Sequence, residues 1–342
     1  MLDAPSASPA HPLIGFGSRI RTSPYFDATV KAGARAWTVY NHMYMPLWYE
    51  SPEADYRRLV EHASLWDVAC ERNIQISGPD ADAFMQYLTP RNLTGCAVGQ
   101  CKYILLTDEA GGVINDPVLL KLGEGRYWLS LADADVLLWA RGLALGLNMD
   151  VTVDELDVSP LQLQGPKSAD IMRDLFGDWV DELKFFWFRQ RELAGIPLVV
   201  SRTGWSGERG YEIYLCDEAR GIELWDHIMT VGRDHGLGPG APSTIRRIEA
   251  GLLSYGADIT RAENPFEVGL DRLVDLDMEA DFVGKAALTR IRETGVRRRL
   301  VGLEIGGPRL AAPNDRPWPV VKNDQTIGRL TSCVFSLALG RN

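Results

Sequence analysis

The chain has 342 residues, of which 46% are hydrophobic and 24% charged, and 36 Lys and Arg stand against 46 Asp and Glu. This length allows two or three structural units around a sizeable core, and the composition is that of a globular protein. A formal net charge of −10 argues against a nucleic acid or an acidic membrane surface as partner.

The N-terminal part predicts an arm followed by a helix. Residues 1–18 are rich in Pro, Ser and Ala and lack the basic and apolar regions of a secretory signal, so we expect a mobile arm. Segment 51–68 predicts a helix, because Ser51 suits the N-cap and Pro52 suits the first helical position.

The next segments predict strands and two helices. The sequence "RNIQISGPDADAFMQYLTP" indicates a strand, a Gly-Pro turn and a helix over 81–88. Two β-rich stretches, 103–122 and 126–131, precede a helix over 132–148 that we expect a glycine to end.

From about residue 151 the order strand, Gly-Pro, helix returns. The stretch "IQISGPDADAFMQYL" is similar to the later "LQLQGPKSADIMRDL", which indicates an internal duplication. Further on we predict strands over 185–200 and 211–216, and helices over 221–235 and 243–254.

The residue pattern of the C-terminal part changes after Arg299. Short apolar runs separated by turn residues, as in "LVGLEIGG" and "WPVVKNDQTIGRLTSCVFSL", predict a small all-β unit. The chain stops just past a predicted strand, so we expect this unit, 291–342, to be incomplete at its end. The region before it divides into 19–150 and 151–290, the two related α/β units.

The sequence lacks the motifs of several other kinds of site. The five cysteines are scattered without a CxxC pair, and the histidines show no HxH or HExxH spacing, so we expect neither disulfides nor a metal. No run of about 18 apolar residues is present, so we expect no membrane span and a cytoplasmic location. Neither a GxGxxG after a strand nor a GxSxG occurs.

Carboxylates and aromatic residues near glycine turns remain as candidates. In "YILLTDEAGGVINDPVLLKL", Asp116 is a lone charge among apolar residues, and such a charge is costly unless a partner meets it. In "RTGWSGERGYEIYL", Glu212 and Tyr214 are two residues apart on a predicted strand, so they share a face, and Trp205 lies nearby.

These segments, in this order, resemble the tetrahydrofolate-dependent aminomethyltransferase superfamily, which contains the glycine cleavage T-protein and several folate-dependent demethylases. The resemblance rests on "YILLTDEAGGVINDPVLL", "LQLQGPKSADIM", "GWSGERGYEIYL", "IRRIEAGLLSYGADIT", "DFVGKAAL" and "GRLTSCVFS", and covers roughly residues 35–342. It implies an α+β fold with duplicated α/β units around a central folate channel and a small C-terminal β-barrel-like domain.

Within the superfamily the chain is most similar to the dimethylsulfoniopropionate demethylases. "NHMYMP", "INDPVLLKL", "KFFWF" and "GLLSYGADITRAENPFE" carry this likeness. A T-protein would have an Asp-Asp pair at Asn115-Asp116 and Tyr at Trp205. The stretch "SGERGYE", however, is closer to the T-protein form "GEDGYE" than to the demethylase form "SKQGGFE".

The resemblance also implies a reaction and site roles. A methyl group would pass from the sulfonium to N5 of tetrahydrofolate, giving methylmercaptopropionate and 5-methyltetrahydrofolate. The implied partners are the sulfonium substrate and folate, with no metal, and a homodimer is possible in this family. The implied residues are Asp116 for catalysis, Tyr103, Asn115, Glu212 and Arg247 for folate, and Phe26, Trp179, Trp205 and Tyr214 for the substrate.

Three alternatives stay open at this point. A related enzyme could take its methyl group from an N- or O-methyl compound, or the chain could be a T-protein itself. A non-enzyme member could be a folate-binding regulatory protein. Those relatives carry a Lys-Gly-Cys-Tyr-x-Gly-Gln-Glu signature, whereas the comparable "DFVGKAALTR" has no cysteine.

Overall fold

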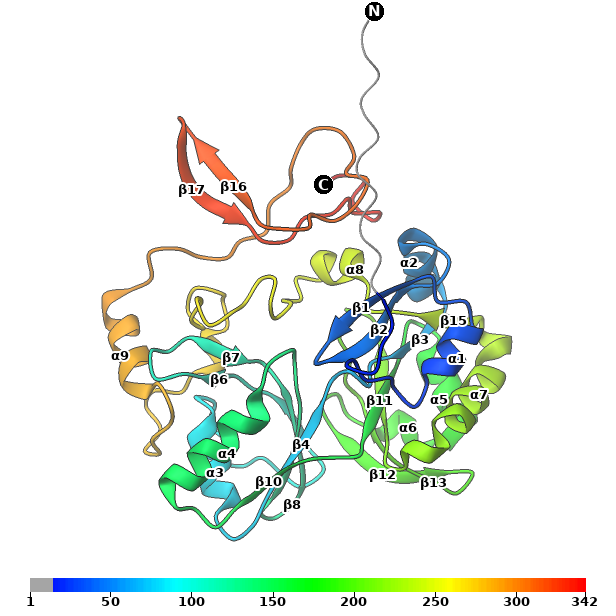
Figure 1. The fold of residues 1–342 in the computed structure, drawn as a ribbon, viewed down its shortest axis with the longest axis horizontal. Helices are drawn as coiled ribbons and strands as arrows, with labels where there is room; N and C mark the ends of the chain where they lie inside the picture. Colours follow the sequence, from blue (N-terminus) through cyan, green and yellow to red (C-terminus); the bar gives the residue numbers. More distant parts are fainter. Residues whose placement is uncertain (1–14) are drawn as a thin grey trace, which may run out of the picture.

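A computed structural model describes residues 15–342, which form two sheets with helices on their outer sides and a C-terminal segment above them (Figure 1). The helices are α1 (Phe26–Lys31), α2 (Pro52–Glu61), α3 (Ala81–Leu88), α4 (Val136–Leu147), α5 (Ser168–Phe176), α6 (Trp179–Glu182), α7 (Gly221–Gly232), α8 (Thr244–Glu249) and α9 (Lys285–Thr294). Within these residues no helix combines the length and apolar character needed to cross a bilayer.

The strands fall into two large sheets and three two-stranded ones. They are β1 (Ala36–Tyr40), β2 (Met43–Trp48), β3 (Ala63–Asp67), β4 (Asn73–Ser77), β5 (Cys101–Tyr103), β6 (Leu106–Thr107), β7 (Val113–Asn115), β8 (Val118–Gly123), β9 (Arg126–Ser130), β10 (Thr152–Glu155), β11 (Ser159–Gln164), β12 (Phe188–Leu193), β13 (Ile196–Ser201), β14 (Gly210–Leu215), β15 (Leu237–Gly240), β16 (Trp318–Lys322) and β17 (Gln325–Leu330). The mixture of helices and mainly antiparallel strands confirms the α+β class.

The first large sheet has the order β10-β4-β9-β8-β5 and is antiparallel throughout. Its outer face packs on α3 and α4 through a buried cluster that includes Ile74, Ile76, Phe84 and Leu129. Alternation along β4 sends its two isoleucines to this cluster, because successive strand residues point to opposite faces.

The second large sheet has the order β12-β13-β14-β11-β3-β15, antiparallel except for the parallel pair β15 and β3. Its outer face packs on α5, α6 and α7 through the largest apolar cluster, which includes Leu161, Ile171, Ile213 and Leu224. We call the opposite face of this sheet, which carries Gln162, Glu212 and Tyr214, the inner face.

The two sheets join edge to edge and also pack face to face. Backbone hydrogen bonds run from Cys101 N to Phe186 O at 2.8 Å and from Phe188 N to Gly99 O at 2.8 Å. A buried cluster between the sheets combines Leu120 and Trp128 of the first sheet with Val199 and Tyr214 of the second. The inner face is therefore shielded from water by the first sheet.

Helix α2 begins as predicted but is shorter than the predicted 51–68. The Ser51 hydroxyl accepts a hydrogen bond from Ala54 N at 3.1 Å, and Pro52 is the first helical residue. After Glu61 the chain turns, and residues 63–67 form the fully buried strand β3 between β11 and β15. Tertiary pairing decided this change, since a short apolar run fits a buried strand or a helix equally well.

Two other predicted helices also end differently. Helix α4 continues through Gly146 to Leu147, and the next residue, Asn148, is the C-cap in the left-handed conformation with φ of 52°. Asparagine tolerates this conformation better than most residues, so the prediction of a glycine cap was wrong. The helix predicted over 243–254 is only α8, because Gly251 follows with φ of +68°.

The C-terminal part contains a single hairpin, β16–β17, which projects from the molecule (Figure 1). Residues 300–317 form no strand, and β17 ends twelve residues before the last residue of the chain. The structure therefore shows no closed barrel in this part, in contrast to the predicted β-barrel-like domain.

The predicted unit boundaries do not coincide with the sheets. Strand β3 belongs to the second sheet although it precedes residue 150, and β10 belongs to the first sheet although it follows it. The boundary at 290/291 falls inside α9. Of the predicted arm, residues 1–14 lie outside the described residues, and Phe16 packs on Tyr44 with ring centroids 4.5 Å apart.

Candidate functional site: carboxylates between two sheets

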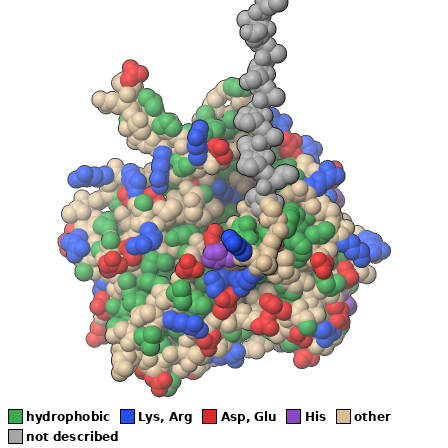
Figure 2. Space-filling model, viewed as in Figure 1, with side chains coloured by type: hydrophobic (Ala, Val, Ile, Leu, Met, Phe, Trp, Pro, Cys, Tyr) green, Lys and Arg blue, Asp and Glu red, His purple; other side chains and the backbone are tan. Residues whose placement is uncertain are grey.

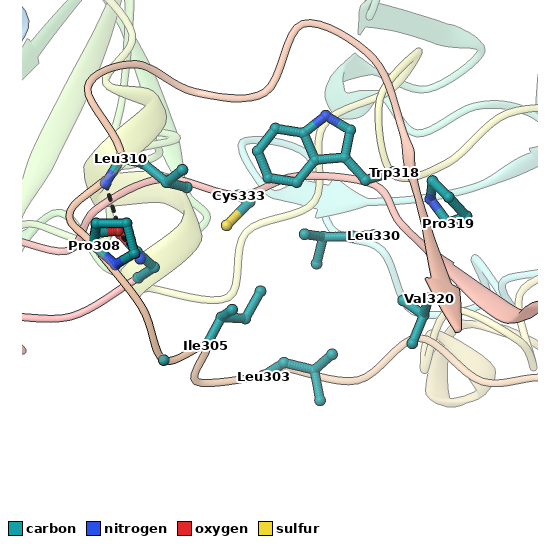
Figure 3. Close-up of a pocket in the computed structure, with 11 residues that line it drawn as sticks. Leu303, Ile305, Pro308, Leu310, Trp318, Pro319, Val320, Leu330 and Cys333 are labelled. Atoms are coloured by element: carbon teal, nitrogen blue, oxygen red, sulfur yellow. Dashed lines mark hydrogen bonds between the residues drawn. The ribbon is translucent and has the colours of Figure 1, made fainter. Parts of the chain in front are cut away.

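A cavity of about 460 Å³ lies in the C-terminal part (Figure 3). The labelled side chains of Leu303, Ile305, Trp318, Leu330 and Cys333 surround it, and all are apolar except for the thiol. Burial raises the pKa of the Cys333 thiol, so the thiolate that reactive cysteines need is disfavoured. This cavity offers no group for acid, base or charge chemistry.

Asp116 lies between β7 and β8, where the chain passes from a small sheet to the first large one. The Tyr103 hydroxyl donates a hydrogen bond to Asp116 Oδ2 at 2.9 Å. Burial raises the pKa of Asp116 to about 7, although the Tyr103 hydrogen bond favours the ionised form. A carboxyl group poised near neutrality suits proton transfer.

The preceding turn fixes the position of Asp116. Gly111 has φ of +85°, a conformation that favours glycine. A side chain at Gly112 would begin 2.3 Å from the backbone oxygen of Arg261, so only glycine allows this close approach. The double glycine therefore lets segments 111–116 and 259–263 pack together, and Tyr255 donates from its hydroxyl to Val113 O at 3.3 Å.

Glu212 is the centre of a buried hydrogen-bond network on the inner face. It accepts hydrogen bonds from Gln162 Nε2 at 2.8 Å, from the Tyr214 hydroxyl at 3.0 Å and from the Thr203 hydroxyl. Its side chain is 3% exposed, and burial raises its pKa in spite of these donors. Gln162 Oε1, on the same amide, is buried and has no hydrogen-bond partner.

The loop after β13 closes over this network. Ser206 donates from its hydroxyl to Gln164 Oε1 at 2.6 Å. A Cβ at Gly204 would lie 2.3 Å from the same amide, so the loop depends on a glycine there. Trp205, between these two residues, donates from its indole nitrogen to Leu253 O at 3.1 Å and is half-buried.

Glu71 is a third carboxylate in this region. It lies between β3 of the second sheet and β4 of the first, where the chain crosses from one sheet to the other. The Ser130 hydroxyl donates to Glu71 Oε2 at 3.3 Å. Burial and the nearby charges of Glu212 and Asp116 raise the pKa of Glu71 well above its usual value.

These three residues, Asp116, Glu212 and Glu71, are here called the carboxylate cluster. Among residues 15–342, no Lys, Arg or His forms an ion pair with any of them. Buried charges are normally paired, so a set of like charges without a counter-charge makes this cluster a candidate functional site. The complement of this cluster is a cation or a hydrogen-bond donor.

The side chain of Asn115 binds the backbone of Ala132 and does not face an open binding site. Its Nδ2 donates to Ala132 O at 3.0 Å, and its Oδ1 accepts from Ala132 N at 3.1 Å. Both ends of the amide are therefore used within the protein. The predicted folate contact of Asn115 would need a further hydrogen bond to one of these same atoms.

Three predicted site residues make contacts with groups outside the cluster. Trp179 packs on the outer face of the second sheet, with the Arg191 guanidinium 4.7 Å from its ring centroid. Phe26 belongs to an aromatic group around the first hairpin, 4.9 Å from the Trp37 ring. Arg247 pairs with Asp258 at 2.5 Å and donates to Ser332 Oγ at 2.6 Å, which ties α8 to the C-terminal part.

Of the residues predicted from the sequence, Asp116 and Glu212 belong to the cluster, Tyr103 and Tyr214 donate hydrogen bonds to them, and Trp205 lies in the loop after β13. Sequence reasoning missed Glu71, Gln162 and Tyr255, the last of which has its pKa raised to about 12 by burial and by Asp116. Gln162 could have been found, since it is two residues before Gln164 on a strand whose alternate residues are apolar. Glu71 gave no signal, because only the crossing between sheets brings it near Asp116.

The region described in residues 15–342 contains no group of three or more His, Cys, Asp and Glu that could hold a metal ion. Figure 2 shows acidic and basic side chains interspersed over one face of the molecule, with a hollow between the body and the C-terminal segment.

Comparison with known proteins identifies the class to which this fold and site belong. Residues 25–278 match the family model described as the GCVT N-terminal domain. The crystal structure of glycine cleavage system aminomethyltransferase T from Bartonella henselae superposes with a TM-score of 0.84 at 26% identity, covering 94% of this chain and 88% of that one.

Curated relatives show the same kinship. The chain is 40% identical over 324 residues to dimethylsulfoniopropionate demethylase DmdA of Ruegeria pomeroyi, covering 95% of this chain and 88% of the relative. It is 30% identical over 331 residues to the aminomethyltransferase of Thermotoga sp., covering 94% and 88%. The chain belongs to the aminomethyltransferase family, and the predictions of this family and of an enzyme are confirmed.

Proposed function

We propose that this enzyme moves a methyl group from dimethylsulfoniopropionate to N5 of tetrahydrofolate, giving methylmercaptopropionate and 5-methyltetrahydrofolate. The observation that carries the proposal is the carboxylate cluster without a counter-charge, since a sulfonium is a cation. Identity of 40% to a dimethylsulfoniopropionate demethylase over 95% of the chain supports the choice of donor.

The residues present suit a folate. Its amino-pyrimidine edge is a hydrogen-bond donor, and the inner face offers acceptors in Glu212 and in the unpartnered Oε1 of Gln162. Leaving such donors and acceptors unpaired would cost about 1–3 kcal/mol each, so their match favours binding. Tyr103 holds Asp116 in place beside this region.

The transfer needs alignment more than acid catalysis. A sulfonium carries an activated methyl group, because a neutral thioether leaves when the carbon–sulfur bond breaks. The attacking amine gains a positive charge and then loses its proton. Asp116 can stabilise that charge and accept the proton, since its pKa of about 7 lets it serve in both protonation states.

Aromatic residues contribute a second means of holding the cation. Trp205 lies in the loop above Glu212, and Tyr214 lies on the inner face beside it. An aromatic face attracts a cation by about 0.5–2 kcal/mol and offers no nucleophile for it to methylate. Trp179 lies on the outer face of the sheet, and this proposal gives Trp179, Phe26 and Arg247 no contact with the reacting groups.

A second candidate is an aminomethyltransferase or an N-demethylase of the same family. The 33% identity to Bacillus cereus aminomethyltransferase and the T-protein-like "SGERGYE" favour it. Incubation of the enzyme with tetrahydrofolate and dimethylsulfoniopropionate tests the choice. We expect 5-methyltetrahydrofolate together with methylmercaptopropionate; absence of both products would reject the sulfonium donor and favour the second candidate.

A further inference from the structure

Glu71 is held in place by backbone contacts on both sides of the sheet crossing. Asn73 Nδ2 donates to Glu71 O at 2.9 Å. The Asn41 side chain donates to Cys70 O at 3.0 Å and to Ala132 O at 3.2 Å. These bonds fix the backbone around Glu71 but leave its carboxylate with one weak donor, the Ser130 hydroxyl at 3.3 Å.

The same network links Glu71 to Asp116. Ala132, which accepts from Asn41, also exchanges two hydrogen bonds with Asn115, the residue before Asp116. One compact set of backbone and amide bonds therefore sets the spacing between the two carboxylates. Such fixed spacing is what a binding site requires, since a mobile carboxylate would lose entropy on binding.

Glu71 has more free acceptor capacity than Glu212, which accepts from three side chains. Glu71 and Asp116 each accept from one hydroxyl, and the bond to Glu71 is the longer, at 3.3 Å against 2.9 Å. Among the described residues Glu71 Oε1 has no hydrogen-bond partner, and the side chain is only half-buried. A ligand can therefore reach it without displacing an existing hydrogen bond.

A second observation, independent of charge, indicates that a ligand completes this region. Gln162 is 1% exposed and its Nε2 binds Glu212, which fixes the amide orientation, yet its Oε1 has no partner. Buried amide oxygens are nearly always satisfied in folded proteins. Gln162 Oε1 lacks a hydrogen-bond donor, and the neighbouring carboxylates lack a counter-cation. A ligand that carries both a donor and a positive charge would satisfy them.

We propose that Glu71 is a specificity-determining residue that contacts the positively charged group of the methyl donor and selects cationic donors over neutral ones. This inference rests on the proposed function for the identity of the donor. It assigns the folate edge to Glu212 with Gln162, the transfer itself to Asp116, and the recognition of the donor's charge to Glu71.

Binding of an unreactive pair of ligands tests the inference without turnover. The probes are 3-(trimethylammonio)propanoate, a permanent cation, and 4,4-dimethylpentanoate, in which carbon replaces the charged nitrogen. Calorimetry on the whole enzyme should show about tenfold or greater preference for the cation. Glu71→Gln should lose most of this preference, whereas Glu71→Asp, which keeps the charge, should retain part of it.

A matched control and a second signal separate charge recognition from folding. Glu293→Gln removes one exposed carboxylate from α9 and should behave as the wild type. Glu71 is surrounded by Glu212, Asp116, Tyr40 and Cys70, and the two carboxylates raise its pKa. A bound cation should therefore release protons, measured in buffers of different ionisation enthalpy, and Glu71→Gln should release fewer.

The outcomes distinguish this inference from the proposed function. Cation preference that is unchanged in Glu71→Gln, or absent from the wild type, overturns the role of Glu71. Equal weakening of both probes in Glu71→Gln also overturns it, because a merely structural role predicts that result. If the wild-type enzyme prefers the cation but cannot use dimethylsulfoniopropionate, and Glu71→Gln loses the preference, Glu71 remains the cation-recognising residue and the proposed donor is rejected.

Discussion

The two faces of the second sheet differ in chemistry although they share the same strands. On β14, Ile213 points to the outer face and is fully buried against the helices, whereas Glu212 and Tyr214 point to the inner face. On β11, Leu161 and Leu163 lie outside, and Gln162 and Gln164 lie inside. The outer face is built from apolar contacts, whereas the inner face combines an apolar cluster with a buried hydrogen-bond network.

The comparison shows how the fold separates stability from function. Apolar burial on the outer face contributes about 25 cal/mol for each Å² removed from water, without any directional requirement. Burial of Glu212 costs free energy and is offset only in part by its three donors, so its pKa stays raised. The apolar outer face therefore offsets the cost of burying a carboxylate on the inner face, which is the arrangement expected of an active site.

The largest effect is expected on the outer face. Ile213→Ala removes a fully buried side chain from the apolar cluster and should lower the free energy of unfolding by about 2–5 kcal/mol. Denaturant titration measures this change. The KM values should stay close to wild type at a temperature where the variant is folded. A changed folate affinity in the folded variant would contradict the separation of the two faces.

The next effect concerns Asp116. Asp116→Asn keeps a similar shape but loses the proton acceptor, so kcat should fall about 100-fold or more. In the wild type, kcat/KM should rise as the pH passes upward through about 7, because only the ionised carboxylate accepts a proton. The variant should lack this limb. Stopped-flow assays at saturating folate measure both, and unchanged turnover would remove Asp116 from the mechanism.

A smaller effect is expected from Glu212 on folate affinity. Glu212→Ala removes the acceptor for the amino-pyrimidine edge, which should raise the folate Kd about ten- to a hundredfold, equivalent to about 1–3 kcal/mol. The KM for the sulfonium should change much less. Titration calorimetry decides between the ligands, and an unaltered folate Kd would rule out this assignment.

The smallest effects compare one tryptophan on each side of the sheet. Trp205→Ala should raise the KM for the sulfonium about tenfold, through loss of roughly 1–2 kcal/mol of cation–π attraction. Trp179→Ala, on the outer face, should leave that KM unchanged and lower only the melting temperature. Steady-state kinetics with both variants measures the contrast. A wild-type KM for the sulfonium in both variants would show that neither ring binds the substrate.

The sequence determined the local elements and most of the residues at the cluster. Period-two alternation predicted that Glu212 and Tyr214 share a face, and the Ser51-Pro52 pair predicted the start of α2. Family motifs identified Asp116, Tyr103 and Trp205. These signals are local, because capping, alternation and turn chemistry depend on residues a few positions apart.

The tertiary structure decided what depends on distant segments. It made 63–67 a central strand, exchanged strands between the predicted units, placed Trp179 on the outer face of the second sheet and paired Arg247 with Asp258. It also brought Glu71 to Asp116 and Glu212, which stand 45 and 141 positions further along the chain. The physical reason is that pairing between strands and the face that a residue occupies follow from which sheets meet, and spacing along the chain does not encode this.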